Sequence, residues 1–72
     1  MNCMNIYSPQ GTIVIYLDEN GYPFERENAR KAGFVKGGKY TVQQTNVYSS
    51  STTVYFDEIP GGWNSVMFGD LE

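Results

Sequence analysis

Two stretches in the second half of the chain alternate between apolar and polar residues, and a polar turn at 49–52 lies between them. Residues 39–48 and 53–59 each place apolar side chains at every second position over much of their length. This period of two is typical of half-buried antiparallel strands, because successive side chains of a strand point to opposite faces. The stretches therefore predict a β-hairpin whose inner face carries Tyr40, Val42, Val54 and Phe56.

The stretch 12–18, TIVIYLD, is apolar at nearly every position. Its β-branched and aromatic residues favour a strand, and it is too short for a typical helix. We assign alternate positions to the core face, namely Ile13, Ile15 and Leu17. Val14 and Tyr16 then point outward, and an exposed apolar face of this kind marks an interface. The strand therefore predicts a homodimer contact through Val14 and Tyr16.

The segment between this strand and the hairpin combines turn residues with a short helical pattern. Asn20-Gly21 and Gly37-Gly38 are turn signals. Residues 29–32 favour a helix, which Gly33 can end in the left-handed conformation. Because the segment carries few apolar residues, we expect one or two helical turns on the surface, after which Phe34 and Val35 return to the core.

The remaining elements complete a small all-β domain. Pro60-Gly61-Gly62 ends the second hairpin strand, since proline cannot donate to the ladder. We expect a tight corner at 63–65 and a final strand that ends at Phe68. The elements predict one domain over residues 1–72: a strongly bent antiparallel barrel of four to five strands with one short helical turn. Its first ten residues are expected to fray. The predicted core comprises Ile13, Ile15, Leu17, Phe34, Val35, Tyr40, Val42, Val54, Phe56, Ile59, Val66 and Phe68.

The composition argues against several kinds of site. The chain has no histidine and a single cysteine, Cys3, which excludes an intrachain disulfide and leaves a metal site poorly supported. The net charge of −3 argues against general nucleic-acid binding, which needs a basic surface. There is neither a run of eighteen apolar residues nor a signal-peptide pattern. We therefore expect a protein of the cytoplasm, without a metal, a cofactor or a membrane span, that does not bind nucleic acid.

The basic residues are unevenly distributed, because all five lie within fourteen positions. They are Arg26, Arg30, Lys31, Lys36 and Lys39. One interpretation is a solvated basic face that balances the acidic remainder of the chain. The other is a site for a small anion or a phosphate group, which arginine and lysine recognise well.

Several turn and strand motifs resemble a known group of proteins. In chain order they are ENGYP, VKGGKYTV, TTVYFDEIPGG and WNSVMF. They are similar to motifs of the small SH3-like barrel proteins that are common in bacteriophage genomes, and the likeness covers roughly residues 12–69. The resemblance implies an SH3-like barrel. It transfers no catalytic residue, because the matching positions are mostly turn and core residues.

Binding is better supported than catalysis. No histidine is present to act as a general base, and the adjacent Asp57 and Glu58 would point to opposite faces of a strand. Eleven of the 72 residues are aromatic (one Trp, six Tyr and four Phe), more than so small a core needs. Tyrosine and tryptophan combine a stacking surface with a polar group and are common at interfaces. We therefore expect a binding protein and not an enzyme.

Two functions remain open. In the first, a phage protein traps a nucleotide immune signal of its host in the host cytoplasm and so blocks a defence system. The ligand-binding residues would be Tyr22, Arg26, Arg30, Lys31, Lys36, Lys39 and Trp63. In the second, the domain is an SH3-like module that docks on a host or phage protein through Tyr16, Tyr55 and Trp63. The first function needs Trp63 at the barrel rim beside Lys36 or Lys39; the alternative is that Trp63 covers the core.

Overall fold

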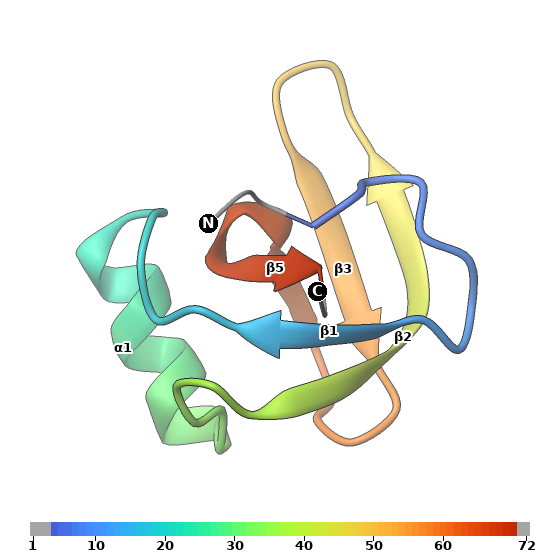
Figure 1. The fold of residues 1–72 in the computed structure, drawn as a ribbon. Helices are drawn as coiled ribbons and strands as arrows, with labels where there is room; N and C mark the ends of the chain where they lie inside the picture. Colours follow the sequence, from blue (N-terminus) through green and yellow to red (C-terminus); the bar gives the residue numbers. More distant parts are fainter. Residues whose placement is uncertain (1–3, 71–72) are drawn as a thin grey trace.

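The structure, a computed structural model, describes residues 4–70 of the chain. Within these residues it contains five strands, one α-helix and one short 3₁₀ helix (Figure 1). In chain order they are β1 (Ile13–Tyr16), α1 (Pro23–Ala32), β2 (Lys39–Val47), β3 (Thr52–Phe56), β4 (Gly62–Asn64), η1 (Ser65–Met67) and β5 (Phe68–Asp70).

The strands form one antiparallel sheet in the order β4-β3-β2-β1-β5. β4 and β5 lie at opposite edges of this sheet, although only the three residues of η1 separate them in the chain. The sheet must therefore curl strongly, so that its two edges approach each other. The predicted all-β, barrel-like fold is confirmed, with five strands. Figure 1 shows α1 beside the sheet, near the C-terminal end of β1. The turn between β2 and β3 projects away from the rest of the sheet.

Phe34 is the centre of the core. Its ring lies 4.7–5.4 Å from five other rings, measured between centroids. These belong to Tyr16, Tyr40, Phe56, Trp63 and Phe68, and so come from β1, β2, β3, β4 and β5. Most of the pairs meet edge to face, the arrangement that the ring quadrupole favours. One residue in the connection after α1 thus joins all five strands.

The predicted orientation of β1 is wrong. Val14 and Tyr16 are fully buried, whereas Ile13 and Ile15 are only half-buried. The physical reason is the pairing with β2, in which Val14 lies opposite Tyr40. Paired residues share a face of the sheet, so the buried Tyr40 places Val14 in the core as well. Val14 and Tyr16 therefore do not form the exposed interface that the sequence suggested.

The helix is longer than expected, with ten residues, and it contributes the fully buried Ala29 to the core. Gly33 ends it with a φ of 116°, a conformation that other residues rarely adopt. The prediction for Val35 is also wrong, because this side chain is exposed. Val35 opens a tight turn whose Gly38 N–H donates to the Val35 carbonyl, and the turn directs the side chain outward.

The two ends of the chain differ in part from what was predicted. Met4 is buried and its N–H donates to the carbonyl of Phe68 in β5, so this residue packs against the sheet. The fraying of the first ten residues stays a prediction. The prediction for Cys3 lies outside the described residues. Near the other end, Trp63 belongs to strand β4 and not to a corner, and the corner is η1. Asn64 begins η1 by accepting a hydrogen bond from Val66 N–H.

Candidate functional site

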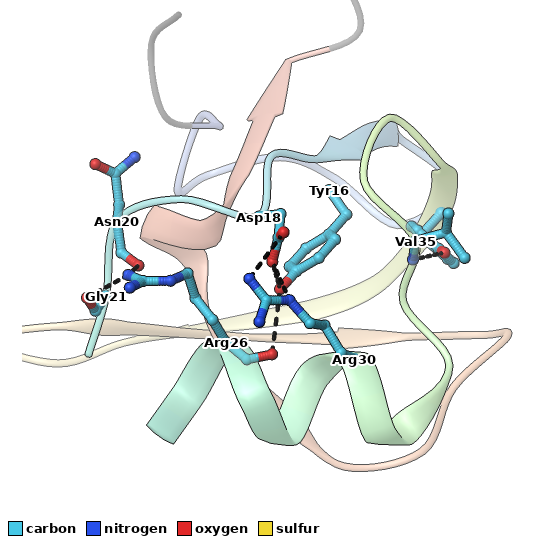
Figure 2. A network of polar contacts seen from close by, with 8 residues as sticks. Tyr16, Asp18, Asn20, Gly21, Arg26, Arg30 and Val35 are labelled. Atoms are coloured by element: carbon cyan, nitrogen blue, oxygen red, sulfur yellow. Dashed lines mark hydrogen bonds and ion pairs between the residues drawn. The ribbon is translucent and has the colours of Figure 1, made fainter. Parts of the chain in front are cut away.

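Two of the predicted anion-binding cations are held by the loop between β1 and α1 (Figure 2). Arg26 Nη1 donates to the carbonyls of Asn20 and Gly21, at 2.8 and 3.2 Å. Arg30 forms two bonds with the Asp18 carboxylate, at 2.8 and 2.9 Å. The loop needs such support, since Asp18 and Asn20 both have the positive φ that side chains disfavour.

The phenol of Tyr16, the last residue of β1, reaches this loop. Its hydroxyl donates to Asp18 Oδ1 at 3.0 Å, as Figure 2 shows. Burial and then this hydrogen bond raise the pKa of Tyr16 to about 12. The hydrogen bonds from Arg30 hold the pKa of Asp18 below its ordinary value. Tyr16, Asp18 and Arg30 thus form a structural network between the core and the helix.

The three lysines of the predicted anion site have different surroundings. Lys31 Nζ lies 3.0 Å from Glu27 one turn earlier in α1. Lys36 lines an open hollow of about 270 Å³ together with residues 15–17, Glu19 and Gly37. Lys39 is exposed on β2, in register with Ile15.

Trp63 borders a different hollow, between α1 and β4. This hollow of about 200 Å³ is lined by Phe24, Glu25, Asn28, Gly62, Trp63, Asn64 and Met67. The indole of Trp63 also packs edge-on against Phe34, with ring centroids 5.1 Å apart, so it covers the core and borders the hollow at once. The structure does not bring Trp63 and Lys36 into one hollow.

Two exposed aromatic rings stand beside this hollow. Tyr22 and Phe24, here called the aromatic ledge, are stacked with centroids 5.7 Å apart and an interplanar angle of 8°. Their exposed fractions are 66% and 62%. Pro23, the first residue of α1, fixes the backbone between them at the start of the helix. Because Phe24 also lines the hollow, the ledge and the hollow form one continuous surface.

Glu25 supplies the carboxylate of this surface. Its Oε1 accepts the N–H of Tyr22 at 2.9 Å, which satisfies a donor at the start of α1. The amide of Asn64 donates to both carboxylate oxygens, at 3.3 and 3.4 Å, and so connects α1 with β4. Gly21 leaves room for this carboxylate, since a β-carbon there would lie 2.9 Å from Glu25 Oε1.

The predicted interface residues have other positions. Val14 and Tyr16 are in the core, as described above. Tyr55 is half-buried on β3 and faces Gly62 on β4, where any β-carbon would lie 3.1 Å from the tyrosine ring. Of the residues predicted for either function, Tyr22 and Trp63 are the two on the ledge and the hollow.

Sequence reasoning missed Phe24, Glu25, Asn28, Asn64 and Met67. A signal for Phe24 existed, because an aromatic residue next to proline at the start of a sparsely apolar helix has little core to enter. The acidic residue two positions after Pro23 was a further sign of a capped helix start. Nothing in the sequence indicated that β4 would lie against this helix.

The described residues give no support for a metal site or a membrane span. Nowhere in residues 4–70 do three cysteine or carboxylate side chains gather as metal ligands would. The same part of the chain has no helix long and apolar enough to cross a membrane.

The fold and this surface define a small, curled all-β protein with an aromatic ledge beside a hollow. The chain belongs to the bacteriophage T4 protein Y07B family, whose family model matches residues 12–71. The resemblance to small phage proteins is thereby confirmed, while its SH3-like part stays a prediction. No curated protein and no solved structure matches the chain.

Proposed function

We propose that this phage protein is a non-enzymatic module that binds a host or phage protein through the aromatic ledge and the adjoining hollow. The observation that carries the proposal is the exposure of Tyr22 and Phe24, of which about two-thirds each is accessible to solvent. The two rings are also stacked on each other, which preorganises them for binding. Adjacent exposed aromatics beside a concave surface are typical of the centre of protein interfaces. Stacking lowers the entropy that the two rings would lose on binding.

The competing hypothesis, capture of a nucleotide immune signal, stays a prediction. Its phosphate-binding residues would have to include Arg26 and Arg30, whose guanidinium groups already bond to carbonyls and to Asp18. Lys31 pairs with Glu27, and Lys36 borders a different hollow from Trp63. These contacts favour a protein partner over a phosphate ligand, since a nucleotide would have to displace them.

The test has two steps: partners are first captured with the full chain, and their binding is then measured. The full chain would capture partners from phage-infected cells, and each would be purified and titrated by calorimetry. We expect the Tyr22→Ser, Phe24→Ser double variant to bind at least tenfold more weakly, because truncating interface aromatics costs about 2 kcal/mol or more. Tyr48→Ser is the matched control, since Tyr48 is 57% exposed on the β2–β3 turn.

Three results would contradict the proposal. The first is that no captured protein binds the purified chain. The second is that the double variant binds as tightly as the wild type. The third is that a nucleotide panel raises the melting temperature while Phe24→Ser leaves that rise unchanged, which would favour nucleotide capture at another site.

A further inference from the structure

The hollow beside the ledge has the wrong charge for an anion and a suitable one for a cation. Of the described residues that line it, Glu25 is the one with an ionisable side chain. Neither of the two ion pairs among the described residues involves Glu25. Arg26 follows it in α1, but its guanidinium bonds to the Asn20 and Gly21 carbonyls. Among residues 4–70, no cation therefore pairs with this carboxylate, which lines the hollow.

Glu25 has capacity for a further donor. A carboxylate offers about four lone-pair positions. Oε1 takes a short bond from Tyr22 N–H, whereas the Asn64 amide shares two long contacts between the oxygens. Oε2 therefore has room for a strong, charge-assisted bond. The existing contacts hold the carboxylate in place, which lowers the entropy that binding would cost.

The rest of the lining suits a flat cation. Phe24 and Trp63 are aromatic residues of the lining, and Asn28, whose side chain contains an amide oxygen, also belongs to it. Aromatic faces attract cations through the ring quadrupole, and arginine is the commoner partner because its planar group also stacks. A guanidinium can bond to a carboxylate and an amide oxygen in one plane, which an ammonium group cannot do.

From these contacts we infer that the hollow binds an arginine side chain of the protein partner, between Phe24 and Trp63 and against Glu25. This inference rests on the proposed function and adds the chemistry of the residue that is recognised. The ledge supplies apolar area, and the hollow selects a partner that places arginine next to an apolar residue. The net charge of −3 would favour the approach of such a partner.

A small probe tests the hollow directly. The full chain would be titrated with N-acetyl-arginine methylamide, and the Trp63 indole N–H signal followed by NMR; the chain contains a single tryptophan. N-acetyl-citrulline methylamide is the control, because it has nearly the same shape without the charge. We expect a saturable shift with arginine and at least fivefold weaker binding of citrulline. Equal affinity for the two, or no saturable shift with arginine, would overturn the inference.

Two matched variants separate charge from structure. Glu25→Gln removes the charge while glutamine still accepts the Tyr22 N–H, so the helix start is kept. Glu27→Gln makes the same change on the same helix, at a carboxylate that pairs with Lys31. We expect arginine to bind at least tenfold more weakly to Glu25→Gln and within twofold of wild type to Glu27→Gln. Equal loss in both variants would indicate general electrostatics and would overturn the site.

The partner then distinguishes the two proposals. If Phe24→Ser abolishes partner binding while Glu25→Gln leaves it unchanged, the proposed function holds and the arginine inference is wrong. If Phe24→Ser has no effect, the proposed function fails, and the role of the hollow in partner recognition fails with it. If both variants lose the partner and Glu27→Gln keeps it, both proposals are supported.

Discussion

Tyr16 combines a fully buried ring with a hydroxyl that reaches the charged pair of Asp18 and Arg30. Its ring also contacts Phe34 and Phe68 in the core. A buried phenol is tolerated because its hydroxyl has an acceptor, and the same environment opposes its ionisation. The residue therefore couples the stability of the core to pH at the alkaline end.

Stability should fall between pH 10 and about 12. The pKa of Tyr16 is raised in the folded chain to about 12 from an ordinary value of 10.0, so its contribution is fully present below pH 10. It is lost as pH rises through the folded pKa, because the unfolded chain releases this proton first. We expect a loss of about 2–3 kcal/mol in the free energy of unfolding. Urea unfolding at several alkaline pH values measures it.

Tyr16→Phe is the control for this effect. It keeps the ring in the core and removes the ionisable group, at a cost of about 1 kcal/mol near neutral pH for the lost hydrogen bond. The variant should then lose less stability than the wild type between pH 10 and 12. An identical alkaline decline in both proteins would assign the effect to another group.

Single residues also show what the sequence could predict. Tyr40 and Val42 alternate with polar neighbours, and Val54 and Phe56 alternate with Thr53, Tyr55 and Asp57, so their burial followed from the pattern. The strand IVIY is apolar on both faces, and its pattern leaves the inward face undetermined. Only its pairing with β2 decides the question, and that pairing depends on residues more than twenty positions away.

At the scale of elements, a side chain supplies a hydrogen-bond acceptor to β2 where the pairing of β2 with β3 ends. Their register shifts between Val42 and Gln44, so Gln43 is an extra residue, as in a β-bulge. Beyond this irregularity, Glu58 accepts the Thr41 N–H at 2.8 Å and the Thr41 hydroxyl at 2.7 Å. The carboxylate thus bonds to a backbone donor of β2 just past the end of β3.

Glu58→Ala should lower the free energy of unfolding by about 0.5–1.5 kcal/mol, because Thr41 loses this acceptor. Burial tends to raise the pKa of Glu58, but the hydrogen bonds from Thr41 outweigh it and hold that pKa below its ordinary value of 4.5. The contribution of Glu58 is therefore present above pH 4.5 and is lost as pH falls through the lower, folded pKa. Urea unfolding at neutral and acid pH measures both effects.

Asp57→Ala is the matched control, as Asp57 is the adjacent exposed carboxylate. We expect it to change neutral stability by less than about 0.5 kcal/mol. An equal loss of stability in the two variants would mean that the negative charge of this turn stabilises the fold, and that the hydrogen bond to Thr41 does not.

Element boundaries were partly readable from the sequence. The hairpin of β2 and β3 was expected at 39–48 and 53–59 and is found at Lys39–Val47 and Thr52–Phe56. The start of α1 was placed too late, because the pattern of alanine and lysine near its end was clearer than the proline at its beginning. No pattern within residues 60–70 could show that β4 and β5 would lie on opposite edges of a curled sheet.

At the scale of the whole molecule, the packing of α1 against β4 creates the hollow. Glu25 and Asn64 are 39 positions apart in the chain, yet their side chains are hydrogen-bonded. Such contacts arise from the closure of the sheet around Phe34. The sequence could therefore single out Tyr22 and Trp63, which lie on the ledge and the hollow, but it could not indicate that the carboxylate of Glu25 would line that hollow.

The same closure bears on the predicted homodimer. The prediction started from Val14 and Tyr16 as an exposed apolar face, but both are buried within one chain, and β1 is paired on both edges by β2 and β5. The half-buried Ile13 and Ile15 are left on the outer face of this strand. A dimer through β1 would now have to form there.

We expect a monomer of 8.1 kDa in sedimentation velocity up to high micromolar concentration, since scattered half-buried side chains need no partner. Ile13→Ser with Ile15→Ser is the informative variant, because it leaves Val14 and Tyr16 in the core. The wild type and this variant should sediment alike. A species of twice the mass that the wild type forms and the variant does not would establish the homodimer and place it on the outer face of β1. A dimer unaffected by the variant, but lost in Tyr22→Ser with Phe24→Ser, would instead make a second copy of the chain the partner of the aromatic ledge.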